Sequence, residues 1–241
     1  YGAATVGAVD RMVDLPDGAR LRLSVHASPE DAPTLLFFHG NGETARDYDA
    51  LAADFQALPV RLVVAEYRGY GPSTGAPSLS TFLDDAHVCL DDVMRIAPVG
   101  APIVVMGRSL GSAPAIELAS TRSDDVSGLI VESGFARIVP LLELIGVPAS
   151  RIGITEEHGP RSLDKMARVT QPTLILHAEH DEIIPIRDAE LLDGACADPD
   201  HDFLRVPDAG HNHLQMRAGA SSFGASGRMV TRVGACRRGG S

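Results

Sequence analysis

The sequence predicts an α/β fold with a mostly parallel, doubly wound sheet, and three observations support that prediction. Short, continuous apolar runs, such as residues 34–38 and 102–106, have the composition of strands that are buried on both faces. Segments whose apolar residues recur at helical spacing lie between these runs. Turns rich in glycine and proline join the two kinds of segment. Such an alternation is typical of βαβ units, which build a parallel sheet.

The N-terminal part is expected to hold an antiparallel hairpin and the first two parallel strands. Residues 11–15 lead into a Pro-Asp-Gly turn, and the alternating residues 21–25 complete the hairpin. The apolar runs at 34–38 and 61–65 are the next two strands. A helix between them is expected to place four side chains on one face: Tyr48, Leu51, Ala52 and Phe55.

The middle of the chain continues the alternation. After a glycine-rich loop at residues 66–75, a helix is expected to hold six apolar residues at helical spacing: Leu79, Phe82, Leu83, Ala86, Leu90 and Val93. The strand at 102–106 and a helix at 112–119 follow. A further buried strand is expected at 128–132.

A short mixed stretch, at about residues 134–170, precedes the last two strands. One helix is expected there on the basis of Ile138, Leu141, Leu142 and Ile145. A loop at 148–160 and a second short helix at 162–167 complete the stretch. It is too short for a large lid domain, so we expect a minimal cap. Strands at 172–177 and 203–206 end the sheet.

Length, charge and composition limit the class of protein. A chain of 241 residues suits one α/β domain, or at most two small ones, and 44% hydrophobic residues are enough for a sizeable core. The formal net charge of −11 argues against a nucleic-acid partner, because binding to phosphates needs basic patches. No apolar run reaches the roughly 18 residues of a membrane span. No signal peptide is recognisable, and the start at Tyr1 leaves a preceding leader open.

The cysteines and histidines indicate no metal site and no disulfide. Cys89, Cys196 and Cys236 form no Cys-x-x-Cys pair. We interpret them as free thiols of a protein in a reducing compartment, and therefore expect a cytoplasmic location. Cys89 falls on the apolar face of a predicted helix and is expected in the core. No two histidines have convincing metal-ligand spacing.

The segment Gly107–Gly111 has the pattern Gly-x-Ser-x-Gly. A predicted buried strand precedes it and a predicted helix follows it, as the nucleophile-elbow motif requires. In such a tight turn a side chain at either flanking position would clash, and glycine removes that clash. Ser109 is then held at the positive end of a helix. The alternative is an ordinary strand-to-helix turn with a capping serine.

A nucleophilic serine needs a base that takes its proton and an acid that orients this base. In the nucleophile-elbow architecture the acid follows the serine in the chain and the histidine comes last, each beyond the end of a later strand. Asp181, in the turn after the strand at 172–177, is the predicted acid. His211, which follows a glycine after the last strand, is the predicted base.

Other residues at these places are weaker candidates. Glu132, at the end of the strand at 128–132, is the rival acid. Glu179 and Glu182 would be interchangeable with the predicted acid if their loop were only a solvated acidic surface. His213 is the rival base, whereas His180 is interpreted as a loop histidine.

The oxyanion of the tetrahedral intermediate needs two N–H donors that already point to it. One is expected from Leu110, the residue after the nucleophile. The other is expected from the loop His39–Gly42 that follows the central strand. Within this loop the N–H of Asn41 is the main candidate, with Gly40 beside it. The alternative is a plain glycine-rich turn.

Five motifs occur in order along the chain: His39–Gly42, Tyr67–Gly71, Gly107–Gly111, Asp181–Pro185 and Gly210–Asn212. Together they resemble the α/β-hydrolase superfamily, in particular the small serine hydrolases with little cap that include esterases, monoglyceride lipases and protein depalmitoylases. The resemblance covers residues 10–213 and implies one α/β-hydrolase domain. It implies that Ser109, Asp181 and His211 form a catalytic triad. It also implies that the loop at 69–73 shapes the site without reacting.

The sequence therefore predicts a serine hydrolase that cleaves esters or thioesters of small-molecule acyl substrates through an acyl-enzyme intermediate. No metal or organic cofactor is expected. A peptidase or amidase would use the same three residues. A non-catalytic binding protein is a third possibility, because fold does not fix function. A dehalogenase is disfavoured, because it would have aspartate at position 109.

Residues 214–241 do not fit the rest of the chain. They contain five arginines and no acidic residue, and they show no sustained apolar face. In the family that the chain resembles, a final helix usually packs on the sheet at this point. We expect either a disordered basic tail or the product of a shifted reading frame, because Arg, Gly, Ala and Ser are abundant in alternative frames of GC-rich DNA.

Overall fold

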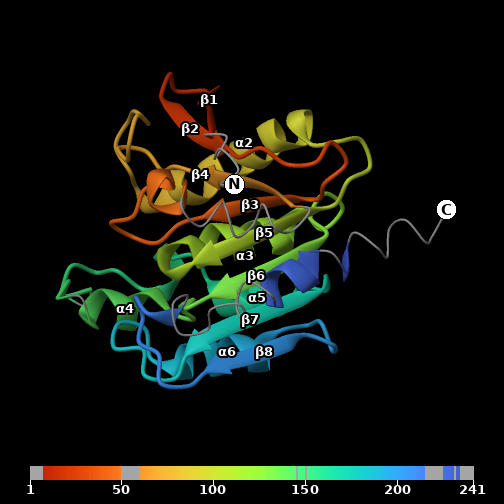
Figure 1. Cartoon of the computed structure of the whole chain (residues 1–241). Coiled ribbons are helices and arrows are strands. Elements are labelled where there is room, and N and C mark those ends of the chain that lie inside the picture. The colour runs from red at the N-terminus through yellow and green to blue at the C-terminus, as the bar shows by residue number, and fades with distance from the viewer. Residues whose placement is uncertain are drawn as a thin grey trace.

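The computed structural model describes residues 8–49, 60–144, 146–149, 151–214, 225–230 and 232–233. Within these residues an eight-stranded sheet runs through the molecule, with the strand order β1-β2-β4-β3-β5-β6-β7-β8. Helices cover the sheet on both faces (Figure 1). The strands are β1 (Val9–Asp14), β2 (Arg20–Val25), β3 (Thr34–Phe38), β4 (Arg61–Ala65), β5 (Ile103–Arg108), β6 (Gly128–Glu132), β7 (Thr173–Ala178) and β8 (Asp202–Val206).

The pairing of these strands confirms the predicted fold class. β1 pairs with β2, and β2 with β4, in the antiparallel sense. All other neighbours in the sheet are parallel. β3 and β6 coincide with two predicted apolar runs, and all their residues are buried. Both strands are therefore central strands that are covered on their two faces.

The helical elements follow the strands as a doubly wound fold requires. The structure describes the α-helices α2 (Leu79–Ile96), α3 (Ser112–Thr121), α4 (Ile138–Leu144), α5 (Ser162–Met166) and α6 (Ile186–Ala195). Short 3₁₀ helices are η1 (Ala45–Tyr48), η2 (Ser109–Gly111) and η3 (Glu156–His158). Ser78 caps α2, and its hydroxyl accepts the N–H of Thr81 at 3.1 Å, as a capping serine does.

Two hydrophobic cores lie against the two faces of the sheet. Alternation along β3 sends Leu36 and Phe38 into one core, and Leu35 and Phe37 into the other. The first core also contains buried residues of α2, α3, α5 and α6. The second contains residues of η1 and of the helical residues 225–230 and 232–233.

Helix α6 is absent from the sequence prediction. Its buried side chains are Ala189 and Leu192. An apolar face of this size gives little periodic signal, and Gly194 near its end weakens the helical pattern further. The helix follows Pro185, whose fixed φ suits a helix start.

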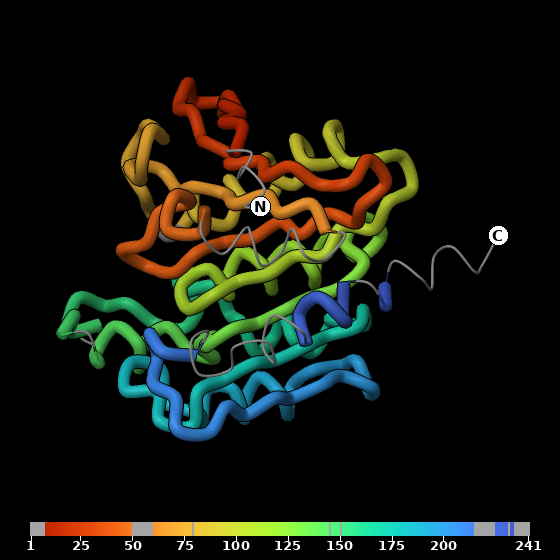
Figure 2. The backbone as a smooth tube through the Cα atoms, viewed as in Figure 1, coloured from red at the N-terminus to blue at the C-terminus, as the bar shows by residue number. Residues whose placement is uncertain are grey.

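Two other predicted elements need comment. Of the helix expected from Tyr48 to Phe55, the structure describes Tyr48, the last residue of η1, and Asp49, which is helical. Leu51, Ala52 and Phe55 lie outside the described residues. The stretch expected as a minimal cap holds α4, η3 and α5, and Ile145 of the first expected helix lies outside the described residues. Figure 2 shows part of it, in green, projecting beyond the edge at which the parallel strands end.

Part of the C-terminal segment is helical, whereas the sequence led us to expect either a disordered basic tail or the product of a shifted reading frame. Residues 225–230 and 232–233 are helical. Met229, Val230 and Val233 are buried in the second core. Their spacing places them on one helix face, yet the surrounding arginines and glycines hide that pattern in the sequence. The shifted-frame hypothesis stays a prediction.

Candidate active site

The Gly107–Gly111 segment forms the sharp turn from β5 to α3. Ser109 has a backbone φ of 52°. This left-handed conformation costs a non-glycine residue about 1–3 kcal/mol and occurs mainly at functional sites. The rest of the fold therefore holds the serine in a strained position at the end of a buried strand.

Steric crowding explains the two glycines of this turn and confirms the expected clash. A Cβ at Gly107 would lie 2.0 Å from the carbonyl oxygen of Gly111. A Cβ at Gly111 would lie 2.0 Å from the carbonyl oxygen of Phe38, the last residue of β3. The turn therefore packs directly against the end of β3, where the loop His39–Gly42 begins.

The structure brings Ser109, His211 and Asp181 together. Nε2 of His211 lies 3.1 Å from Oγ of Ser109. Nδ1 of His211 lies 2.7 Å and 2.9 Å from the two carboxylate oxygens of Asp181. His211 is 4% exposed and Asp181 8%. Because Asp181 is an acceptor when ionised, this geometry places the proton of neutral His211 on Nδ1 and leaves Nε2 free to accept the serine proton.

Asp181 is held as a carboxylate by its surroundings. Its Oδ1 accepts the backbone N–H groups of Ile183 at 3.0 Å and Ile184 at 2.7 Å. Burial alone would raise the pKa of Asp181. The hydrogen bonds from His211 and from the Ile184 N–H outweigh burial and hold this pKa below its ordinary value. Asp181 is therefore ionised at neutral pH.

The rival residues have other places. Glu132 lies with its Oε1 3.2 Å from Nε of Arg108. Glu182 accepts the backbone N–H of His211 at 3.1 Å. The structure describes no hydrogen bond between Glu182 and the imidazole ring. His180 and His213 are exposed. The residues in the acidic loop are therefore not interchangeable, because the imidazole contact belongs to Asp181.

The structure describes the hydrogen bonds of two residues in the predicted oxyanion loop, Gly40 and Asn41. The backbone N–H of Gly40 donates to Oε2 of Glu43 at 2.7 Å, so this N–H is already engaged. The side chain of Asn41 accepts the hydroxyl of Tyr70 at 2.7 Å, which leaves the Asn41 backbone N–H as the predicted donor of this loop. The N–H of Leu110 stays the second predicted donor.

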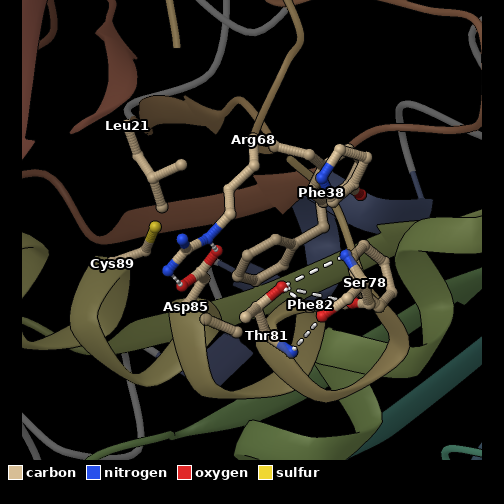
Figure 3. A pocket seen from close by; sticks show the side chains of 11 residues that line it. Leu21, Phe38, Arg68, Ser78, Thr81, Phe82, Asp85 and Cys89 are labelled. Atoms are coloured by element: carbon tan, nitrogen blue, oxygen red, sulfur yellow. Dashed lines mark hydrogen bonds and ion pairs between the residues drawn. The ribbon is translucent and has the colours of Figure 1, made fainter. Parts of the chain in front are cut away.

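The Tyr67–Gly71 loop braces the loop that carries Asn41. The hydroxyl of Tyr67 donates to the carbonyl oxygen of His39 at 2.6 Å. The next residue, Arg68, points to Asp85 on α2 and donates two hydrogen bonds to its carboxylate, of 2.7 Å and 2.9 Å (Figure 3). The loop is thus anchored on α2 and supports the loop after β3. The shaping role of residues 69–73 stays a prediction.

The sequence analysis missed two contributors to this site, Arg108 and His177. Arg108 is 7% exposed, and its Nη2 donates to the carbonyl oxygen of His211 at 3.0 Å. His177 is fully buried and donates from Nε2 to the carbonyl oxygen of Ile184 at 2.8 Å. The one available signal was the position of Arg108 inside the Gly-x-Ser-x-Gly motif.

Within the described residues, no group of three or more His, Cys, Asp or Glu side chains could hold a metal ion. Cys89 is buried and Cys196 half-buried, both as free thiols, and Cys236 lies outside the described residues. No helix in the described part of the chain is long and apolar enough to cross a membrane.

The sheet topology, the strained serine and its histidine and aspartate neighbours define the α/β-hydrolase class. The family described as serine aminopeptidase, S33 matches residues 29–154, and the chain belongs to this family of α/β hydrolases.

Individual relatives agree with this assignment. The chain is 35% identical to protein bem46 of Schizosaccharomyces pombe over 193 residues, which are 77% of this chain and 63% of that protein. The chain thus spans less than two thirds of the length of bem46. It is 30% identical over 227 residues to the uncharacterized protein Rv2307c of Mycobacterium tuberculosis, covering 92% of this chain and 79% of that protein.

Solved structures with low sequence identity share the fold. A soluble variant of the monoglyceride lipase of Saccharomyces cerevisiae superposes with a TM-score of 0.77 at 16% identity, covering 97% of each chain. The esterase Pf2001 of Pyrococcus furiosus gives a TM-score of 0.77 at 15% identity, covering 93% of this chain and 92% of that chain.

Proposed function

We propose that the protein is a serine hydrolase that cleaves carboxylic esters or thioesters through an acyl-enzyme intermediate. The observation that carries this proposal is the continuous chain of contacts from Ser109 Oγ to His211 Nε2 and from His211 Nδ1 to Asp181. A serine in this setting can lose its proton to the histidine as it attacks. The esterase and lipase neighbours in fold support the choice of an ester substrate.

In the first half of the reaction, Oγ of Ser109 bonds to the substrate carbonyl carbon, and its proton moves to Nε2 of His211. The carbonyl oxygen becomes an oxyanion, which the N–H groups of Asn41 and Leu110 stabilise. The proton on Nε2 then passes to the leaving alcohol or thiol as its bond to the carbonyl carbon breaks. The acyl group stays on Ser109.

Water completes the reaction. His211 takes a proton from the water as the water oxygen attacks the acyl carbon. The same proton returns to Oγ of Ser109 when the acid leaves. Asp181 remains ionised throughout and stabilises the imidazolium that forms twice in each cycle.

The test uses a fluorophosphonate probe and a series of p-nitrophenyl esters of rising acyl length. We expect the probe to label wild-type protein, and Ser109→Ala to abolish both labelling and turnover. His211→Ala should lower turnover by about 10⁴-fold or more. Labelling that persists in Ser109→Ala would contradict the assignment of the nucleophile.

A peptidase is the second candidate, because the matching family is described as serine aminopeptidase. Amide cleavage needs the same three residues and a harder leaving group. Aminoacyl p-nitroanilides, assayed beside the p-nitrophenyl esters, separate the two activities. A higher kcat/KM for the anilides would favour the peptidase. Turnover of neither series, without labelling by the probe, would favour a binding protein.

A further inference from the structure

We propose that Arg108 and Glu182 are positioning residues that clamp the backbone of His211 and so set the place of its imidazole. The proposal rests on the proposed function, because it assigns a role relative to the base of a serine hydrolase. The clamp itself is a geometric feature and is tested below by a measurement that needs no substrate.

His211 lies in the loop after β8, where no regular ladder fixes the backbone. Its N–H donates to Oε2 of Glu182 at 3.1 Å. Its carbonyl oxygen accepts from Nη2 of Arg108 at 3.0 Å. Two charged side chains therefore bind the two polar backbone groups of this one residue. Hydrogen bonds with an ionised partner are stronger than neutral ones.

The two clamp residues are sequence neighbours of the proposed nucleophile and the proposed acid. Arg108 directly precedes Ser109, and Glu182 directly follows Asp181. The residue next to the nucleophile and the residue next to the acid thus each bind the backbone of the base. A displacement of the His211 loop would stretch contacts to both of its partners at once.

The guanidinium of Arg108 is itself held firmly. Its Nε lies 3.2 Å from Glu132, and its Nη1 pairs with Glu43. Burial opposes the charge, but the two carboxylates outweigh burial and raise the pKa of Arg108. The guanidinium supplies five donors in a fixed plane, which lysine cannot reproduce. Arg108 can therefore serve Glu132, Glu43 and His211 together.

Glu43 extends the arrangement to the loop after β3. Its Oε2 accepts the N–H of Gly40 at 2.7 Å and the hydroxyl of Tyr48 at 2.5 Å. The same guanidinium therefore ties the base loop to the loop that carries the predicted oxyanion donor Asn41. The base and this donor share one rigid support.

Two glycines leave room for the clamp. A Cβ at Gly210 would lie 2.6 Å from Oε2 of Glu182. A Cβ at Gly40 would lie 3.0 Å from Nη1 of Arg108 and 2.9 Å from Oε2 of Glu43. Both glycines precede a residue with a proposed role, His211 and Asn41. The charged groups thus come so close to the backbone that a side chain at either position would have to displace them.

Glu182 offers the cleaner test, because its side chain is exposed and its removal should not unfold the protein. We expect Glu182→Ala to lower kcat for p-nitrophenyl acetate about tenfold, with KM unchanged within about twofold. Glu182→Gln keeps an acceptor oxygen and should recover most of the activity. The matched control is Glu179→Ala, an exposed residue of the same loop, which should leave kcat unchanged.

Arg108 is tested with a control of similar burial. Arg22 is 2% exposed and pairs with buried Glu66 at 2.8 Å. Arg108→Gln and Arg22→Gln each remove the guanidinium beside a buried carboxylate, Glu132 or Glu66, and should lose comparable stability in urea. We expect the rate of fluorophosphonate labelling to fall about 10²-fold in Arg108→Gln, because a small misplacement of the base is costly. It should fall less than about threefold in Arg22→Gln. Equal loss in both variants would contradict the clamp.

A third measurement separates the clamp from the proposed function. The proton on Nδ1 of His211 is hydrogen-bonded to Asp181, and its NMR signal can be recorded without a substrate. We expect this signal to shift or broaden in Glu182→Ala and to stay unchanged in Glu179→Ala. If the fluorophosphonate does not label wild-type protein and no ester is turned over, the proposed function is wrong. The NMR comparison still tests the clamp in that case. An unchanged signal and unchanged kcat in Glu182→Ala would overturn the clamp while the proposed function stands.

Discussion

Nε2 of His177 lies 3.5 Å from Oδ2 of Asp181 and donates to the carbonyl oxygen of Ile184 at 2.8 Å. Since a carbonyl oxygen only accepts, Nε2 carries the proton. The N–H of Ile184 in turn donates to Asp181 at 2.7 Å. Burial lowers the pKa of His177 and keeps this buried imidazole neutral. His177 therefore supports Asp181, the proposed acid, through Ile184.

Replacement of His177 by leucine should weaken this support. The carbonyl oxygen of Ile184 would lose its donor in a buried place, at a cost of about 1–3 kcal/mol in the free energy of unfolding. The Ile184 N–H would also be held less firmly against Asp181. We expect fluorophosphonate labelling of Ser109 to slow by about tenfold. Urea unfolding and the labelling rate, measured on the same samples, check both effects.

The control for this variant is His180→Leu. His180 lies three residues further along the chain and is exposed. Its replacement should change the free energy of unfolding by less than about 0.5 kcal/mol and leave labelling unchanged. Similar losses in the two variants would show that the loop is sensitive to any substitution and that His177 has no specific role.

The left-handed backbone of Ser109 predicts a trade-off between stability and activity. Glycine adopts a φ of 52° without strain, so Ser109→Gly should raise the free energy of unfolding by about 1 kcal/mol. The same change removes the proposed nucleophile and should abolish labelling. Urea unfolding at neutral pH measures the gain.

Arg161 provides a matched comparison, because its φ is 53° and it is exposed at the start of α5. Arg161→Gly should raise stability to a similar degree, since its surface ion pair with Asp164 contributes little. This variant should keep full activity. A loss of stability in Ser109→Gly would mean that the turn does not store strain.

Local patterns and chain order made much of the site predictable. Ser109 follows a buried strand, and Asp181 and His211 follow later strands of a parallel sheet. Parallel strands end at one edge, so residues just beyond them converge. The clamp was not predictable in this way. Arg108 and His211 are 103 positions apart, and a contact over that separation leaves no periodic trace in one sequence.

The contrast between local patterns and long-range contacts also explains which elements of the fold could be predicted. Apolar runs predicted β3, β4 and β6 at their observed limits, because burial on both faces favours apolar residues along nearly the whole strand. Helix α6 buries Ala189 and Leu192, too few to produce a pattern. The helical segment around Val230 depends on contact with distant strands. Such tertiary contacts decide where local preference is weak.

Glu117 on α3 predicts a pH-dependent part of the stability. Its carboxylate accepts from His87 of α2 at 3.4 Å and pairs with Lys165 of α5, the only lysine in the chain. The hydrogen bond from His87, followed by that from Lys165, outweighs burial and lowers the pKa of Glu117 from 4.5 to about 2. Glu117 thus links three helices on one face of the sheet.

The sign follows from linkage. A carboxyl group whose pKa is lower in the folded state stabilises that state fully above its unfolded pKa and loses the effect as pH falls. Glu117→Gln should therefore lower the free energy of unfolding by about 2 kcal/mol at pH 7. The difference from wild type should shrink below a pH of about 4.5 and vanish near about 2.

Urea titrations of both proteins across this pH range measure the difference directly. Glu157→Gln is the control for loss of one carboxylate, because Glu157 is exposed. It should change stability by less than about 0.5 kcal/mol at any pH in the range. A difference between Glu117→Gln and wild type that stays constant with pH would contradict the titration of Glu117.

Val230 tests whether the C-terminal helical segment stabilises the fold. It is fully buried in the core that also contains Leu174 and Leu176 of β7. Val230→Ala removes two buried carbon atoms and should cost about 2 kcal/mol in the free energy of unfolding. Arg232→Ala alters an exposed neighbour on the same segment and should cost less than about 0.5 kcal/mol.

The comparison of these two variants decides between two views of the segment. A loss confined to Val230→Ala means that the helix packs on the sheet in solution and covers its second face, as the burial of Met229 and Val233 beside it requires. Equal, small effects mean that the segment is loose in solution, as its arginine- and glycine-rich composition led us to expect. In that case the apolar residues of β6 and β7 on this face would be open to water, and the free energy of unfolding would be low for a sheet of this size.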